Sequence, residues 1–114
     1  MGVFIKGDIV IVPFPFSDLS TAKRRPALVL TDSEQDGYGD FILAQITSQQ
    51  KTDACAIEIN ADDFECGALR HTSNVRPNKL FTANESAVIY KAGNLQAKKM
   101  KEILSQTASQ FNAE

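Results

Sequence analysis

The feature that most constrains the fold is a pair of apolar runs within Gly7–Thr31, separated by a polar segment. The runs are Ile9–Phe16 and Ala27–Leu30; valine, isoleucine and leucine are frequent in them, and prolines or turn residues bound them, which is typical of β-strands. Pro13 and Pro15 have no backbone N–H to donate, so the first strand must leave its sheet, or run along an edge, by Pro13. This stretch therefore predicts two strands joined by a polar loop.

The rest of the chain continues as short strands and ends in one helix. Further strands are predicted at Phe41–Thr47, Ala54–Ile59, Thr72–Arg76, Lys79–Thr82 and Ala87–Tyr90. From about Gln96 the apolar positions take helical spacing, at Met100, Ile103, Leu104, Ala108 and Phe111. The sequence thus predicts a mainly β (α+β) domain over residues 1–114, a strongly bent antiparallel sheet or partly open barrel with a C-terminal helix over one side.

Length and composition exclude several classes. A chain of 114 residues has room for one core. No apolar run is long enough to span a membrane and the N-terminus does not resemble a signal peptide, so we expect a cytoplasmic protein with no membrane partner. Cys55, Cys66 and His71 lack the spacing of zinc ligands, so no metal or cofactor is expected.

The net charge of −2 is not that of a strongly basic nucleic-acid binder. The basic residues do cluster, however, at Lys23–Arg25 and again at Arg70, Arg76 and Lys79. Local charge decides whether a phosphate is bound, so both clusters are candidate RNA contacts.

Two residues at strand ends suggest a site for phosphodiester chemistry. Arg25 precedes Pro26, which biases it to an extended backbone, and Thr47 ends a later strand before Ser48. If the two strands are antiparallel neighbours, a fixed cation lies close to two hydroxyls. That set suits RNA cleavage, in which the 2′-OH attacks and the protein stabilises charge on phosphorus. The plainer alternatives are a solvated basic turn and a pair of strand-ending hydroxyls.

His71 is the only histidine, the residue type most often used for proton transfer near neutral pH, although a histidine in a polar turn is commonly just exposed. Most phenylalanines fall in strand contexts and are assigned to the core. Phe14 and Phe16 lie beside the polar loop and are candidates for stacking on bases.

Three blocks together resemble a known family. GDIVIVPFPFSDLSTAKRRPALVLT, ILAQITSQ and SNVRPNKLFT resemble the PemK/MazF toxins of bacterial toxin–antitoxin systems, in the right order and over nearly the whole chain. The resemblance implies a small SH3-like antiparallel β-barrel with a C-terminal helix, of the CcdB/PemK/MazF type, and a homodimer.

The resemblance also implies an activity. It predicts a type II toxin that is a sequence-specific, metal-independent endoribonuclease, cleaving single-stranded mRNA to 2′,3′-cyclic phosphate and 5′-OH ends without a cofactor. The implied partner besides RNA is a cognate antitoxin, whose tail folds across the toxin dimer and whose complex with the toxin binds DNA.

Site residues follow from matching positions. The resemblance makes Arg25 and Thr47 catalytic, with Ser48, His71 and Arg76 as auxiliary candidates. RNA contacts are predicted in the polar loop, at Ser17, Asp18, Ser20, Thr21, Lys23 and Arg24. Some members carry a functional carboxylate where this chain has no acid between Arg70 and Glu85, so a water, Thr47 or His71 would act as the base.

Two other functions fit the same fold. One is a non-nucleolytic toxin that poisons a protein target such as DNA gyrase, as the related CcdB-like toxins do. The other is a binding module that kept only antitoxin recognition. Neither requires the pair of Arg25 and Thr47, so that pair distinguishes the endoribonuclease from both.

Overall fold

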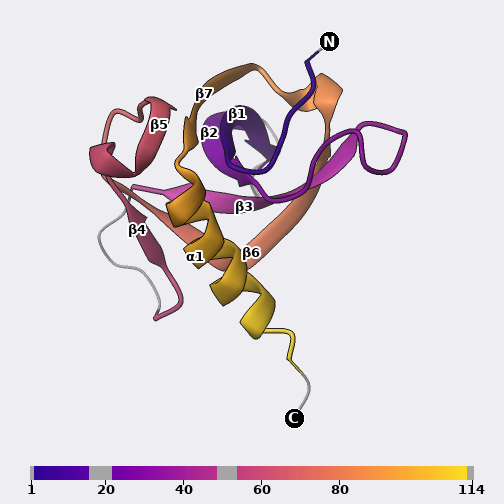
Figure 1. Ribbon diagram of the computed structural model, residues 1–114. Coiled ribbons are helices and arrows are strands. Elements are labelled where there is room, and N and C mark those ends of the chain that lie inside the picture. The colour runs from indigo at the N-terminus through magenta and orange to yellow at the C-terminus, as the bar shows by residue number, and fades with distance from the viewer. Residues whose placement is uncertain (1, 16–21, 49–53, 113–114) are drawn as a thin grey trace.

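In the residues that the structure describes, seven strands form one curled antiparallel sheet with a helix packed against it (Figure 1). This computed structural model describes residues 2–15, 22–48 and 54–112. The elements are β1 (Asp8–Pro15), β2 (Ala22–Val29), β3 (Asp40–Thr47), β4 (Ile57–Ile59), the 3₁₀ turn η1 (Ala61–Asp63), β5 (Phe64–Gly67), β6 (Ser73–Asn84), the 3₁₀ turn η2 (Glu85–Ala87), β7 (Tyr90–Leu95) and α1 (Ala97–Ser109). The strand order is β4-β6-β3-β2-β1-β7-β5. The predicted mainly β fold with a C-terminal helix is confirmed.

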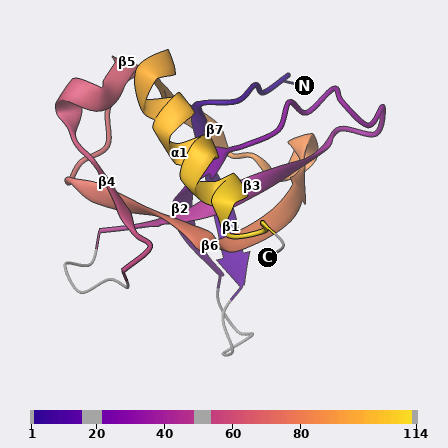
Figure 2. The same cartoon turned by 60° about the horizontal axis from the view of Figure 1, so that its bottom comes forward.

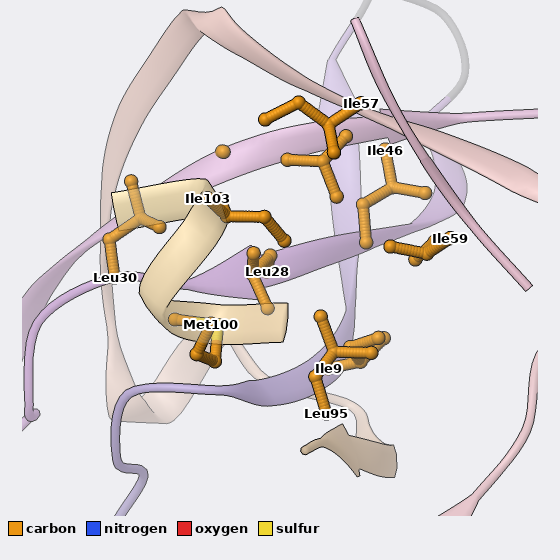
Figure 3. Packing of buried hydrophobic residues seen from close by; sticks show 11 residues of the cluster. Ile9, Leu28, Leu30, Ile46, Ile57, Ile59, Leu95, Met100 and Ile103 are labelled. Carbon is orange, nitrogen blue, oxygen red and sulfur yellow. The ribbon is translucent and has the colours of Figure 1, made fainter. Parts of the chain in front are cut away.

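Alternation along the strands gives the sheet an apolar layer on each face. The helix-side core consists of Ile9, Leu28, Leu30, Ala44, Ile46, Ile57, Ile59, Val75, Leu95, Met100 and Ile103 (Figure 3). The opposite-face core consists of Phe4, Val10, Val12, Ala27, Val29, Phe41 and Leu43. Strands β1, β2 and β3 contribute to both, which is why their sequences read as nearly continuous apolar runs.

Helix α1 lies over the helix-side core (Figure 2). Met100, Ile103 and Thr107 are its buried residues. The predicted start near Gln96 is confirmed, because Gln96 is the N-cap. Phe111, predicted on the buried face, lies beyond the helix end and is 69% exposed. No helix among the described residues is long and apolar enough to cross a membrane.

Several strand predictions have the wrong extent. Strand β4 covers only Ile57–Ile59 of the predicted Ala54–Ile59, and β2 begins at Ala22 rather than at Ala27. The run Ala87–Tyr90 is not a strand: Asn84 caps the turn η2, and β7 begins only at Tyr90. The strands predicted at Thr72–Arg76 and Lys79–Thr82 are one strand, β6, because Pro77 and its neighbours are absorbed by a register shift opposite Ala44 and Gln45. Proline has no N–H to donate to a ladder, and a bulge accommodates Pro77 within the strand.

Strand β5 is held against β7 by two glycines. Gly67 has φ +76°, and a Cβ there would collide with the backbone of Ala92 and Gly93. A Cβ on Gly93 would meet the carbonyl oxygen of Cys66. Glycine is therefore required on both strands for this close approach. The contact fixes where the chain leaves β5, and hence the course of the segment that follows.

Candidate active site

A cavity of about 380 Å³ opens where β2 and β3 separate. Their paired residues end at Ala27 and Gln45. Beyond that point Arg24, Arg25 and Pro26 of β2 border the cavity from one side, and Ile46 and Ser48 border it from the other.

The cavity floor is apolar. Ile11 of β1 pairs with Pro26 of β2 and with Tyr90 of β7, so these three residues form one row across the sheet. Ile46 of β3, 1% exposed, lies on the same face. All four line the cavity.

The segment 68–71 supplies the remaining wall, with Ala68, Leu69, Arg70 and His71 all lining the cavity. The segment leaves β5, which lies at one edge of the sheet beside β7, and leads to β6, which lies near the other edge. Only residues 60–63 join β4 to β5, so the curl of the sheet brings its two edges close together, and the segment runs between them. A second hollow of about 160 Å³ lies along the same segment, bordered also by Ile59 and Phe64.

Arg25 and Thr47 lie on neighbouring strands and on one face. Arg25 pairs with Val12, and alternation places both on the side of Ala27 and the opposite-face core. Extending the register of Ala27 and Gln45 by two residues sets Arg25 across from Thr47. Both are half-buried. They therefore stand at the gap between the strands, and Arg25 also borders the cavity on the helix-side face.

The auxiliary candidates divide between the two faces. Ser48 and His71 line the cavity with Arg24 and Arg25, although more than forty positions of sequence separate His71 from Arg25. Arg76 does not line this cavity: it pairs with Gln45, on the face of Thr47, and its Nη1 donates to Gln45 Oε1 at 3.5 Å.

Part of the predicted RNA-binding loop is strand. Lys23 and Arg24 belong to β2, where they pair with Phe14 and Pro13, so they point to opposite faces. Arg24 borders the cavity, whereas Lys23 lies on the side of Phe14 and the opposite-face core. The predicted contacts Ser17, Asp18, Ser20 and Thr21 lie outside the described residues.

Sequence reasoning missed Tyr90 as a site residue. It was assigned to the end of a strand that does not exist, whereas it begins β7 and lines the cavity. Its pairing with Ile11 depends on β1 and β7 lying side by side, and no local pattern signals that. Phe14, a stacking candidate, instead packs edge-on against Phe81 with ring centroids 4.8 Å apart; Phe16 lies outside the described residues.

Comparison with known families gives one match over most of the chain. A family model described as the PemK-like, MazF-like toxin of type II toxin–antitoxin systems matches residues 5–111. No curated protein sequence is significantly similar.

Solved structures share the fold. An endoribonuclease in complex with its cognate antitoxin, from a mycobacterial species, superposes with a TM-score of 0.72 at 14% identity, covering 97% of this chain and 99% of the other. MazF of Deinococcus radiodurans superposes with a TM-score of 0.75 at 20% identity, covering 96% of this chain and 97% of the other. A chain of the MazE–MazF complex of the same organism superposes with a TM-score of 0.76 at 19% identity, covering 97% of this chain and 98% of the other. At such identities the likeness establishes the curled sheet with its C-terminal helix.

Proposed function

This chain belongs to the PemK-like, MazF-like toxins of type II toxin–antitoxin systems, and from that membership we propose that it is an endoribonuclease acting on single-stranded mRNA. The observation that carries the proposal is the gap between β2 and β3. It gathers Arg24 and Arg25 from one part of the chain and Arg70 from a distant one around one cavity, with His71 beside them. A concentration of cations in a protein of net charge −2 is what binding of a phosphate backbone requires.

Arg25 and Thr47 are the proposed catalytic residues. The 2′-OH of the RNA attacks the adjacent phosphorus, forming a P–O2′ bond while the P–O5′ bond breaks. Arg25 stabilises the negative charge that develops on the non-bridging oxygens, because a guanidinium can donate two parallel hydrogen bonds to them. Thr47 donates its hydroxyl to a non-bridging oxygen from the adjacent strand. The products carry a 2′,3′-cyclic phosphate and a 5′-OH.

Two proton transfers complete the reaction. One proton leaves the 2′-OH, and one is taken up by the departing O5′. We assign the first transfer to His71, because it borders the same cavity as Arg25. A water delivers the proton to O5′. Replacing His71 with glutamine therefore slows cleavage, whereas binding of an RNA that lacks the 2′-OH is unchanged.

The proposed partners are a cognate antitoxin and a second copy of the chain. The mycobacterial neighbour is an endoribonuclease in complex with its cognate antitoxin, which supports the first. Exposed apolar side chains outside the cavity, among them Ile42 and Ile89, offer surface for such contacts. DNA binding is proposed for the toxin–antitoxin complex.

The test is cleavage of a long RNA by the purified protein in EDTA, followed by mapping of both ends. Cuts at a short shared sequence, with cyclic phosphate on one side and 5′-OH on the other, are expected. Intact RNA, or ends bearing a 5′-phosphate, would overturn the proposed chemistry. The relatives described above lend no support to the alternative of a toxin that poisons a protein target.

A further inference from the structure

The cavity contains more than phosphate binding needs. Phosphate oxygens require hydrogen-bond donors and positive charge, which Arg24, Arg25 and Arg70 provide at its border. Ile11, Pro26 and Ile46 provide neither, yet they form the floor. The volume of about 380 Å³ lies within the range of roughly 300–1,000 Å³ typical of small-molecule sites. An apolar floor inside a cationic border suits a flat, largely apolar group attached to a phosphate.

Tyr90 presents an aromatic ring at this border. It is the first residue of β7, is 55% exposed, and is held beside the floor by its pairing with Ile11. Proteins that bind single-stranded nucleic acid combine a positively charged groove with aromatic side chains on which bases stack. Tyr90 and the arginines form that combination.

The other exposed or loop-side aromatics are less suited to the role. Phe14 packs against Phe81. Tyr38 is 83% exposed, but it lies in the turn between Asp36 and the start of β3 at Asp40, where negative charge disfavours an RNA backbone. Phe111, 69% exposed, lies beyond the end of α1 and does not line the cavity.

We propose that the cavity is a subsite for one nucleobase of the RNA, with the base stacked on Tyr90 over the apolar floor and Arg24 bound to an adjacent phosphate. The subsite lies on the helix-side face, next to the gap at which Arg25 and Thr47 meet the scissile phosphate. Tyr90 therefore positions one flanking nucleotide. This inference rests on the proposed endoribonuclease function and specifies how that site holds its substrate.

The chain provides its own spectroscopic probe, because it has no tryptophan and two tyrosines. In a Tyr38→Phe variant, Tyr90 is the only tyrosine. Titration with an RNA carrying 2′-deoxy substitutions, which cannot be cleaved, should quench the tyrosine emission through stacking, beyond the loss that absorption by the RNA itself causes. Emission that stays constant while the RNA binds would overturn the subsite.

Affinity gives a second measurement. Tyr90→Ala should weaken binding of the same RNA by about 5- to 150-fold, the equivalent of roughly 1–3 kcal/mol for one stacked base. Tyr90→Phe keeps the ring and should bind within about twofold of the parent, and so should Tyr38→Ala, the matched control. Equal losses in Tyr90→Phe and Tyr90→Ala would assign the effect to the hydroxyl and overturn stacking.

A series of single abasic positions in the RNA separates stacking from a damaged fold. Removing the base that occupies the subsite should weaken binding to the parent protein but not further weaken binding to Tyr90→Ala. If every abasic position affects both proteins alike, the subsite is wrong while cleavage by the parent still supports the proposed function. If the parent neither binds nor cleaves RNA, the proposed function fails, and the subsite fails with it.

Discussion

Arg25 combines a restrained backbone with a position at an opening. Pro26 holds it extended, pairing with Val12 fixes its register, and the paired part of β2 and β3 ends just beyond it. Its backbone therefore has little conformational freedom to lose when a phosphate binds. Such preorganisation is what makes a charged donor effective against developing charge.

Replacing Arg25 with alanine should lower the single-turnover rate constant for RNA cleavage by about 10²–10³-fold, because one donor to the developing charge contributes on the order of 3 kcal/mol. Arg25→Lys should recover little of the rate, since a point charge replaces a planar fork. Thermal unfolding should show both variants folded. Lys101→Ala, on the exposed side of α1, is the matched charge control and should cleave normally. An alanine variant within a few-fold of the parent would remove Arg25 from the mechanism.

Among the elements, the short strand β5 has the largest influence on the cavity. It is four residues long, and its contact with β7 depends on the close approach of Gly67 and Gly93. From there the segment 68–71 leads toward β6 and brings Arg70 and His71 to the cavity.

Gly67→Ala should destabilise the protein by about 2 kcal/mol or more, because a left-handed backbone becomes strained and the new Cβ meets Ala92. Gly37→Ala is the matched control: Gly37 also has positive φ, +80°, but a Cβ there would meet nothing within 4 Å. Gly37→Ala should lower the free energy of unfolding by only about 1–2 kcal/mol and leave RNA cleavage unchanged. Chemical denaturation and cleavage assays on both variants measure the difference. Equal effects would mean that the glycine contact does not support the cavity.

The same element marks what local sequence can predict. Strands β1 to β3 contain apolar runs, and helix α1 has helically spaced apolar residues, within a few consecutive positions. Their existence could therefore be predicted, and the polar residues that bound the apolar runs of β2 and β3 indicate Arg25 and Thr47. Strand β5, with only Phe64 partly buried, has no such pattern. Tyr90 enters the cavity because β7 pairs with β1, some eighty positions away in the sequence. The pairing of the whole sheet determines contacts of that kind, so they cannot be recognised from the residues next to Tyr90 in the sequence.

Across the molecule, two groups of like charge lie at opposite ends of β2 and β3. Asp32, Glu34 and Asp36 lie in the connection between these strands and Asp40 begins β3, whereas arginines border the cavity at the far end of the two strands. RNA binding should therefore depend steeply on salt although the net charge is −2.

Lys23 and Arg24 test which face the RNA backbone follows, because they are adjacent in sequence and point to opposite faces of β2. Arg24→Ala should reduce the slope of log binding constant against log salt by about 0.7, the value for one phosphate of a single strand. It should weaken binding of many RNA sequences about equally. Lys23→Ala should change the slope less. A larger effect from Lys23 would place the RNA backbone on the side of the opposite-face core.

The segment 68–72 is fixed at both ends and has a hollow on each side. The pair of Gly67 and Gly93 holds one end, and Ser73, paired with Ile59, holds the other. Leu69 is the residue of this segment that packs against the helix-side core, and the other side chains of the segment are not part of that core. Natural variation at Ala68, Arg70 and Thr72 can therefore occur without altering the sheet or the proposed base, His71. If the proposed cleavage is correct, such changes would alter which RNA sequences are cut while the architecture stays constant, and transplanting these three positions from another member should transfer part of the preference of the donor.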